Sequence, residues 1–117
     1  MNPSPVTALA TELGCIRIHP LLLDRDSRRV FVSGTEVQLS RVQFDVLEML
    51  MENPRRVVDR RTLLLAGWGG YGSSKALEDA ISRLRARIAV AGGPRIAECV
   101  RGVGYRLGIA VPPVLGG

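Results

Sequence analysis

Apolar residues between positions 73 and 90 recur every three or four residues and predict an amphipathic helix. Its predicted buried face carries Leu77, Ala80, Ile81, Leu84 and Ile88. At about 100° per residue, the opposite face is centred on Lys75, Asp79, Ser82 and Ala86, and Arg83 and Arg85 flank it. Small polar side chains edged by arginines suit the major groove of DNA. The periodicity alone favours an ordinary solvated face.

A β-hairpin is predicted directly after this helix. Residues 96–100 and 105–107 have the composition of two short strands, and Arg101-Gly102-Val103-Gly104 lies between them. Glycine permits the positive φ and the close approach that a tight turn needs. We therefore expect Arg101 to lie at the tip of a wing beside the helix.

The preceding sequence predicts a small sheet and two more helices. Short apolar strands are expected at 15–18, 21–23, 29–32 and 36–39, separated by turn residues. Ser40 and Gln43 form a capping box that opens a helix over 41–52. After a brief extended link at 57–58, Asp59 caps a second helix that ends near Gly67, and Ser74 is the expected cap of the third.

Two stretches of sequence carry a resemblance to a known family. ISRLRARI followed by RIAECVRGVGYRL is similar to the recognition helix and wing of OmpR/PhoB-type response-regulator effector domains, and SRVQFDVLEMLMENPRRVVDRRTLLLAGWG resembles their first two helices. The likeness covers residues 15–108. It implies an α+β winged helix-turn-helix with an N-terminal four-stranded antiparallel sheet, three helices and a C-terminal β-hairpin wing.

The resemblance also implies a function and a set of site residues. It implies sequence-specific binding of double-stranded DNA in transcription regulation, within a two-component phosphorelay, by tandem pairs on direct repeats. The implied DNA-facing residues are Lys75, Asp79, Ser82, Arg83, Arg85 and Arg101. Arg83 is the expected base reader, Arg85 and Lys75 the expected phosphate contacts, and Arg101 the expected minor-groove contact. In the family, the loop that holds Trp68 and Tyr71 can touch RNA polymerase.

Asp79 departs from the family pattern. The family commonly has Val-Asp-Val-His where this chain has Leu77-Glu78-Asp79-Ala80, so a carboxylate replaces an apolar side chain. Asp79 would repel phosphate unless it accepts from a cytosine amino group or pairs with Arg83 four residues later. A domain without specific DNA binding, or a winged helix that contacts RNA polymerase or another protein, are the alternatives that this departure leaves open.

Composition and charge support the resemblance and argue against other classes. The 117 residues suit one domain at 14–108 with tails at 1–13 and 109–117, and the net charge is +5 from fifteen Arg and one Lys. His19 is the only histidine, the cysteines lack metal-ligand spacing, and the sequence has no long apolar run. We therefore expect no enzymatic activity, no cofactor, no small-molecule substrate and no membrane partner. We expect a cytoplasmic protein in which Cys15 and Cys99 are buried free thiols.

Overall fold

The computed structural model describes residues 14–109 and begins with an antiparallel sheet. Its strands follow chain order, as β1 (Cys15–Ile18), β2 (Leu21–Asp24), β3 (Arg29–Val32) and β4 (Thr35–Val37). The four predicted strands are confirmed, although β4 begins earlier and ends before Leu39. The predicted tails, apart from Ile109, lie outside the described residues.

Within residues 14–109, three helices follow the sheet: α2 (Arg41–Glu52), α3 (Arg60–Trp68) and α4 (Ser74–Val90). The Ser40–Gln43 capping box opens α2, and the Asp59 carboxylate accepts from the Thr62 N–H at the start of α3, both as predicted. The expected cap of α4 was wrong by one residue. Ser73 has extended dihedrals and accepts from the Ala76 N–H, so Ser74 already belongs to the helix.

The wing is part of a three-stranded sheet. Strands β6 (Glu98–Val100) and β7 (Gly104–Arg106) form the hairpin, and β5 (Val58–Asp59) pairs with β7 on its other side. Strand β6 is shorter than the predicted 96–100, and β7 has the predicted length but begins one residue earlier, at Gly104. Ala97 has a φ of +62°, which interrupts the extended backbone before β6. The extended link predicted at 57–58 therefore supplies a strand that ties the wing to the start of α3.

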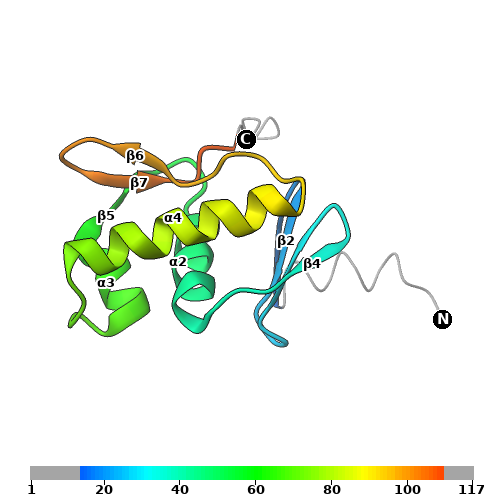
Figure 1. The fold of residues 1–117 in the computed structure, drawn as a ribbon, viewed down its shortest axis with the longest axis horizontal. Coiled ribbons are helices and arrows are strands. Elements are labelled where there is room, and N and C mark those ends of the chain that lie inside the picture. The colour runs from blue at the N-terminus through cyan, green and yellow to red at the C-terminus, as the bar shows by residue number, and fades with distance from the viewer. Residues whose placement is uncertain (1–13, 110–117) are drawn as a thin grey trace, which may run out of the picture.

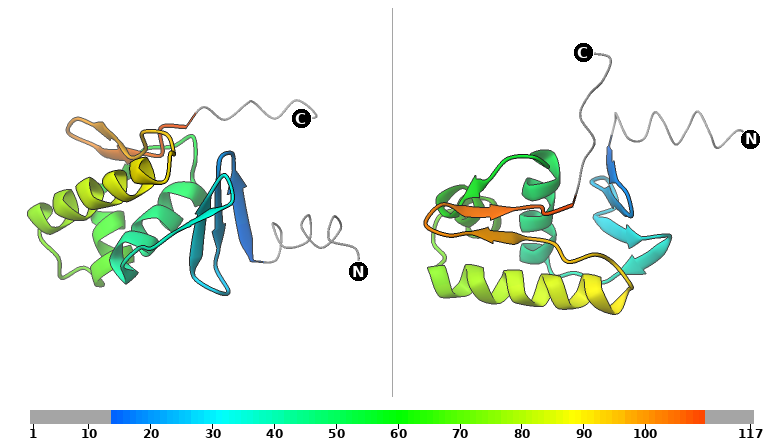
Figure 2. Two further views of the ribbon diagram at one scale, coloured as in Figure 1. Left: turned by 45° about the vertical axis from the view of Figure 1, so that its right-hand side comes forward. Right: turned by 90° about the horizontal axis from the view of Figure 1, so that it is seen from above.

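The core lies where the inner face of the four-stranded sheet meets the three helices. Figures 1 and 2 show the sheet at one end of the molecule, α4 running across α2, and the wing beside α4. Fully buried Leu21 and Leu23 of β2 join Leu47 and Leu50 of α2 and Leu84 of α4 in one cluster. This arrangement confirms the predicted α+β winged helix-turn-helix class.

The two cysteines have different environments, which corrects one expectation. Both are free thiols, but only Cys15 is buried, and Cys99 is exposed on the short strand β6. Burial, followed by the nearby Asp24 carboxylate, raises the pKa of the Cys15 thiol. Within residues 14–109, no helix is long and apolar enough to cross a bilayer, and no three His, Cys, Asp or Glu side chains are grouped to hold a metal ion.

Candidate nucleic-acid interface

Helix α4 has the two faces that its periodicity predicted. Its buried residues are Leu77, Ala80, Ile81, Leu84 and Ile88, which anchor it to the core. On the opposite side Lys75, Asp79, Ser82 and Arg83 are exposed. The packing of the buried face fixes the position of the exposed face, as a binding surface requires.

Arg83 is the unpaired cation of this face. Its side chain is exposed, and among residues 14–109 it makes no hydrogen bond or ion pair. It borders a shallow hollow whose other lining residues include Ser40 and Trp68. A guanidinium without an internal partner keeps all of its donors for an external acceptor.

Asp79 pairs with Lys75 and not with Arg83, the partner that the sequence suggested. Its Oδ1 lies 3.8 Å from the Lys75 Nζ, one turn earlier on the same helix. The alternative pairing with Arg83 is therefore wrong. Because both members are exposed, the pair contributes little to stability and can open for a ligand.

Arg85 has a different place from the expected phosphate contact. Its Nε donates to the Ile96 carbonyl over 3.0 Å, and its Nη2 donates to the Ala97 carbonyl. The side chain is half-buried under the chain that leads into the wing. Two of its donors are thus already used inside the domain, which the expected phosphate contact did not include. Periodicity placed Arg85 at the edge of the outward face but gave no sign of these carbonyls.

The wing places Arg101 at its tip, as predicted. The turn is closed by a hydrogen bond from the Val103 N–H to the Val100 carbonyl over 3.0 Å, and Gly102 has a φ of +78°. Arg101 is exposed and, within the described part of the chain, has no partner. Figures 1 and 2 show the tip of the hairpin near the end of α4 at which that helix begins.

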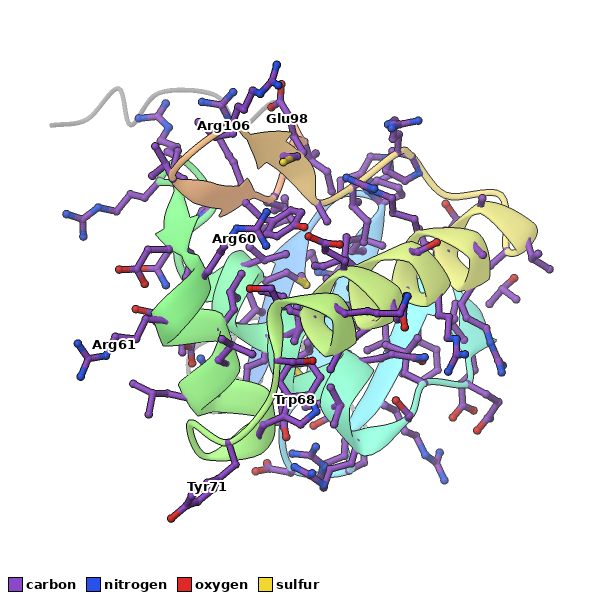
Figure 3. All side chains as sticks on the ribbon, turned by 60° about the vertical axis from the view of Figure 1, so that its left-hand side comes forward. Arg60, Arg61, Trp68, Tyr71, Glu98 and Arg106 are labelled. Atoms are coloured by element: carbon purple, nitrogen blue, oxygen red, sulfur yellow. The ribbon has the colours of Figure 1, made fainter. Side chains whose placement is uncertain are left out.

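One contact that sequence reasoning missed ties these elements together. The Arg60 guanidinium lies 5.4 Å from the ring centre of Tyr105 in β7, and its Nη1 is 3.6 Å from Oε2 of Glu78 on α4. Figure 3 shows Arg60 between α3, α4 and the wing. Arginines precede and follow Asp59 in the sequence, but pairing across the fold leaves no local signal in such a run.

The two aromatic residues near the α3–α4 loop behave differently. Trp68 is half-buried against the core, and a Cβ on Gly72 would come within 2.7 Å of its Cγ. Tyr71 is 96% exposed and points away from the body of the domain (Figure 3). Of this pair, only Tyr71 presents its ring to solvent.

A family model agrees with this geometry. The model described as "Transcriptional regulatory protein, C terminal" matches residues 34–107, which include all three helices and the wing. The chain belongs to this family. Its membership confirms the resemblance to OmpR/PhoB-type effector domains that the sequence indicated.

Named relatives of this transcriptional-regulator family are similar in sequence. Response regulator MprA of Mycobacterium sp. strain KMS is 43% identical over 89 residues, which cover 74% of this chain and 39% of the relative. MprA of Mycobacterium tuberculosis H37Rv is 40% identical over 100 residues, covering 84% and 44%. The chain thus spans 39–44% of the length of these response regulators.

Solved structures share the fold. The Klebsiella pneumoniae RstA DNA-binding domain in complex with the RstA box is 32% identical, with a TM-score of 0.68 over 80% of this chain and 95% of that one. Thermotoga maritima DrrB, an OmpR/PhoB homologue, is 29% identical with a TM-score of 0.70 over 92% and 52%. The AdeR DNA-binding domain in complex with an intercistronic region is 22% identical and supports the fold alone, with a TM-score of 0.73 over 78% and 96%.

Proposed function

We propose that this chain is the sequence-specific, double-stranded DNA-binding domain of a transcriptional regulator, with α4 in the major groove and the wing in the minor groove. The proposal rests on two guanidinium groups that have no hydrogen-bond or ion-pair partner among residues 14–109: Arg83 on α4 and Arg101 at the wing tip. Family membership and the similarity to the RstA domain solved with its DNA box support it.

The four residues on the outward face of α4 then have defined roles. Arg83 donates to guanine O6 and N7, and Ser82 can donate to or accept from a base edge. Asp79 accepts from the amino group of cytosine, while Lys75 turns to a neighbouring phosphate and offsets the repulsion of the carboxylate. Arg101 enters the minor groove, where narrow A·T-rich sequence attracts a guanidinium.

A salt titration with a matched pair of variants tests this function. Binding to a selected site should weaken steeply with salt, because phosphate contacts release counterions. Arg83→Ala should lose about 1–3 kcal/mol of specific binding and relax preference at one base pair. Arg29→Ala removes an exposed arginine from β3, outside the interface, and should leave affinity and preference unchanged.

Two results would contradict the assignment. Binding that does not depend on the salt concentration would exclude a polyanion such as DNA as the ligand. Equal affinity and equal base preference for the wild type and Arg83→Ala would show that Arg83 does not read the site, whatever the overall affinity.

A wider role follows from the relatives named response regulators. We propose that the domain serves as the cytoplasmic effector part of a two-component response regulator and that two copies bind direct repeats head to tail. The support is the match to MprA, of which this chain covers 39–44%. Footprinting and the stoichiometry on a selected site test the arrangement; one copy on a single, unrepeated site would contradict it.

A protein contact through the α3–α4 loop is the second candidate function. Tyr71 is almost fully exposed, and Leu65 on α3 is 54% exposed, so both side chains are accessible to a protein partner. We propose that this surface contacts RNA polymerase. Tyr71→Ala should keep DNA affinity but lower activation of transcription in a purified system. Unchanged activation on a promoter that needs this protein would exclude a role for Tyr71.

A further inference from the structure

The base of the wing is closed at two buried residues that precede β6. Ile96 and Ala97 are fully buried, and the Ala97 N–H donates to the Leu107 carbonyl over 2.9 Å. Ala97 also has the left-handed φ noted above, at which a non-glycine residue needs support from its surroundings. The position of the wing residues that follow depends on how Ile96 and Ala97 are held.

The two strands of the wing are held in different ways. Strand β7 lies between β5 and β6, so it is paired on both sides and joined through β5 to α3. Strand β6 is the edge, has only three residues and pairs with β7 alone. A short edge strand gains little stability from its own ladder, so its placement depends on what holds its base.

Arg85 holds that base to the helix that carries Arg83. The side chain reaches from α4 to the two consecutive carbonyls of Ile96 and Ala97 and donates to each from a different nitrogen. The planar guanidinium fixes the direction of both donors, and a cation strengthens hydrogen bonds to neutral carbonyls. A lysine could not reproduce this two-point contact.

We propose that Arg85 is a positioning residue that sets the wing relative to α4, so that Arg101 and Arg83 reach neighbouring grooves of one duplex together. The inference rests on the proposed DNA-binding function and deepens it. It assigns Arg85 to the geometry of the site and not to a phosphate contact.

A double-mutant cycle measures this coupling. In the wild type, Arg101→Ala should weaken binding to a site with an A·T-rich flank by about tenfold or more. In an Arg85→Ala or Arg85→Lys background the same change should cost less than about threefold, because the wing is no longer placed to deliver Arg101. Arg85→Lys is decisive, since lysine would preserve a phosphate contact but not the two-carbonyl contact.

Two control arms separate positioning from general weakening. Arg87 is also on α4 and donates to a backbone carbonyl, that of Gln38 over 3.2 Å, on a segment outside the wing. Arg87→Ala should leave the cost of Arg101→Ala intact. The cost of Arg83→Ala should likewise be unchanged in the Arg85→Ala background. Additive costs for Arg85 and Arg101, with a salt slope lowered by about 0.9 and rescued by lysine, would overturn the proposal in favour of a phosphate contact.

Amide exchange tests the same inference without DNA, so its failure is separable from failure of the proposed function. In Arg85→Ala and Arg85→Lys the Ala97 amide should exchange at least about tenfold faster relative to amides in the middle of α2. Unchanged exchange at Ala97 would overturn the positioning role even if the domain binds DNA. Faster exchange in a domain that binds no DNA would retain the role for the wing and refute only the function proposed above.

Discussion

Gly104 is a position at which the backbone of the wing lies against the backbone of β5. A Cβ there would overlap the Val58 carbonyl oxygen and lie 2.7 Å from the Cα of Asp59, both backbone atoms of β5. Neither can rotate away as a side chain would, so Gly104→Ala must push β7 from β5. We therefore expect the substitution to open the pairing that joins the wing to α3.

The size of the loss can be worked from these contacts. Overpacking against fixed atoms costs about 1–3 kcal/mol, and each backbone hydrogen bond lost from the short β5–β7 ladder costs about 0.5–1.5 kcal/mol. Together they predict a loss of about 3–4 kcal/mol in the free energy of unfolding. Because a small domain has only about 5–15 kcal/mol in total, the variant should remain folded but be clearly less stable.

Urea unfolding followed by circular dichroism measures this loss, with Gly102→Ala as the matched control. Gly102 lies in the same hairpin at a φ of +78° but has no atom within 4 Å of an added Cβ. Its cost is backbone strain alone, about 1–2 kcal/mol. Two results would contradict the close approach of β7 to β5. Gly102→Ala could prove as destabilising as Gly104→Ala, or Gly104→Ala could unfold like the wild type.

Three other substitutions or reactions follow from burial and capping. Leu84→Ala removes a fully buried side chain of α4 and should cost about 2–5 kcal/mol in urea unfolding; a loss well under this range would mean that α4 is not packed as described. Hydrogen bonds from the Thr62 side chain and backbone lower the pKa of Asp59, so its stabilising effect is present above about pH 3.9, the unfolded value, and is lost as the pH falls through the folded pKa. Asp59→Ala should therefore be less stable than the wild type at pH 7 and lose less on acidification from pH 5 to 3, whereas parallel pH profiles would refute the cap. Iodoacetamide should label exposed Cys99 well before buried Cys15, as mass spectrometry of peptides would show, and equal rates would contradict their different burial.

Local rules predicted the helices and most of the first sheet. The spacing of Leu77, Ile81 and Leu84 gave the buried face of α4, and Ser40 with Gln43 gave the start of α2. These signals depend on residues close in sequence, so the chain itself carries them. The αL conformation of Gly69 ends α3 at Trp68, one residue beyond the expected end near Gly67.

The contacts that organise the site could not be predicted because they join distant segments. Val58 pairs with Tyr105, and Arg85 reaches Ile96 and Ala97, through geometry that exists only once the chain has folded. An arginine at the edge of a helix face has the same local pattern whether it meets a phosphate or a carbonyl. For that reason the sequence pattern placed Arg85 at the edge of the outward face but gave no sign of the Ile96 and Ala97 carbonyls that it contacts.

Selection of bound sequences from a random double-stranded DNA pool is the most direct test of sequence-specific recognition by α4 and the wing. We expect enrichment of a defined site in which a guanine and a cytosine lie within the reach of Arg83 and Asp79 on α4, beside an A·T-rich stretch for Arg101. Repetition of the selection with Arg83→Ala should lose the guanine and keep the A·T-rich stretch. A pool that shows no enrichment over its starting composition, at a salt concentration where the protein still binds DNA, would contradict sequence-specific recognition by this surface.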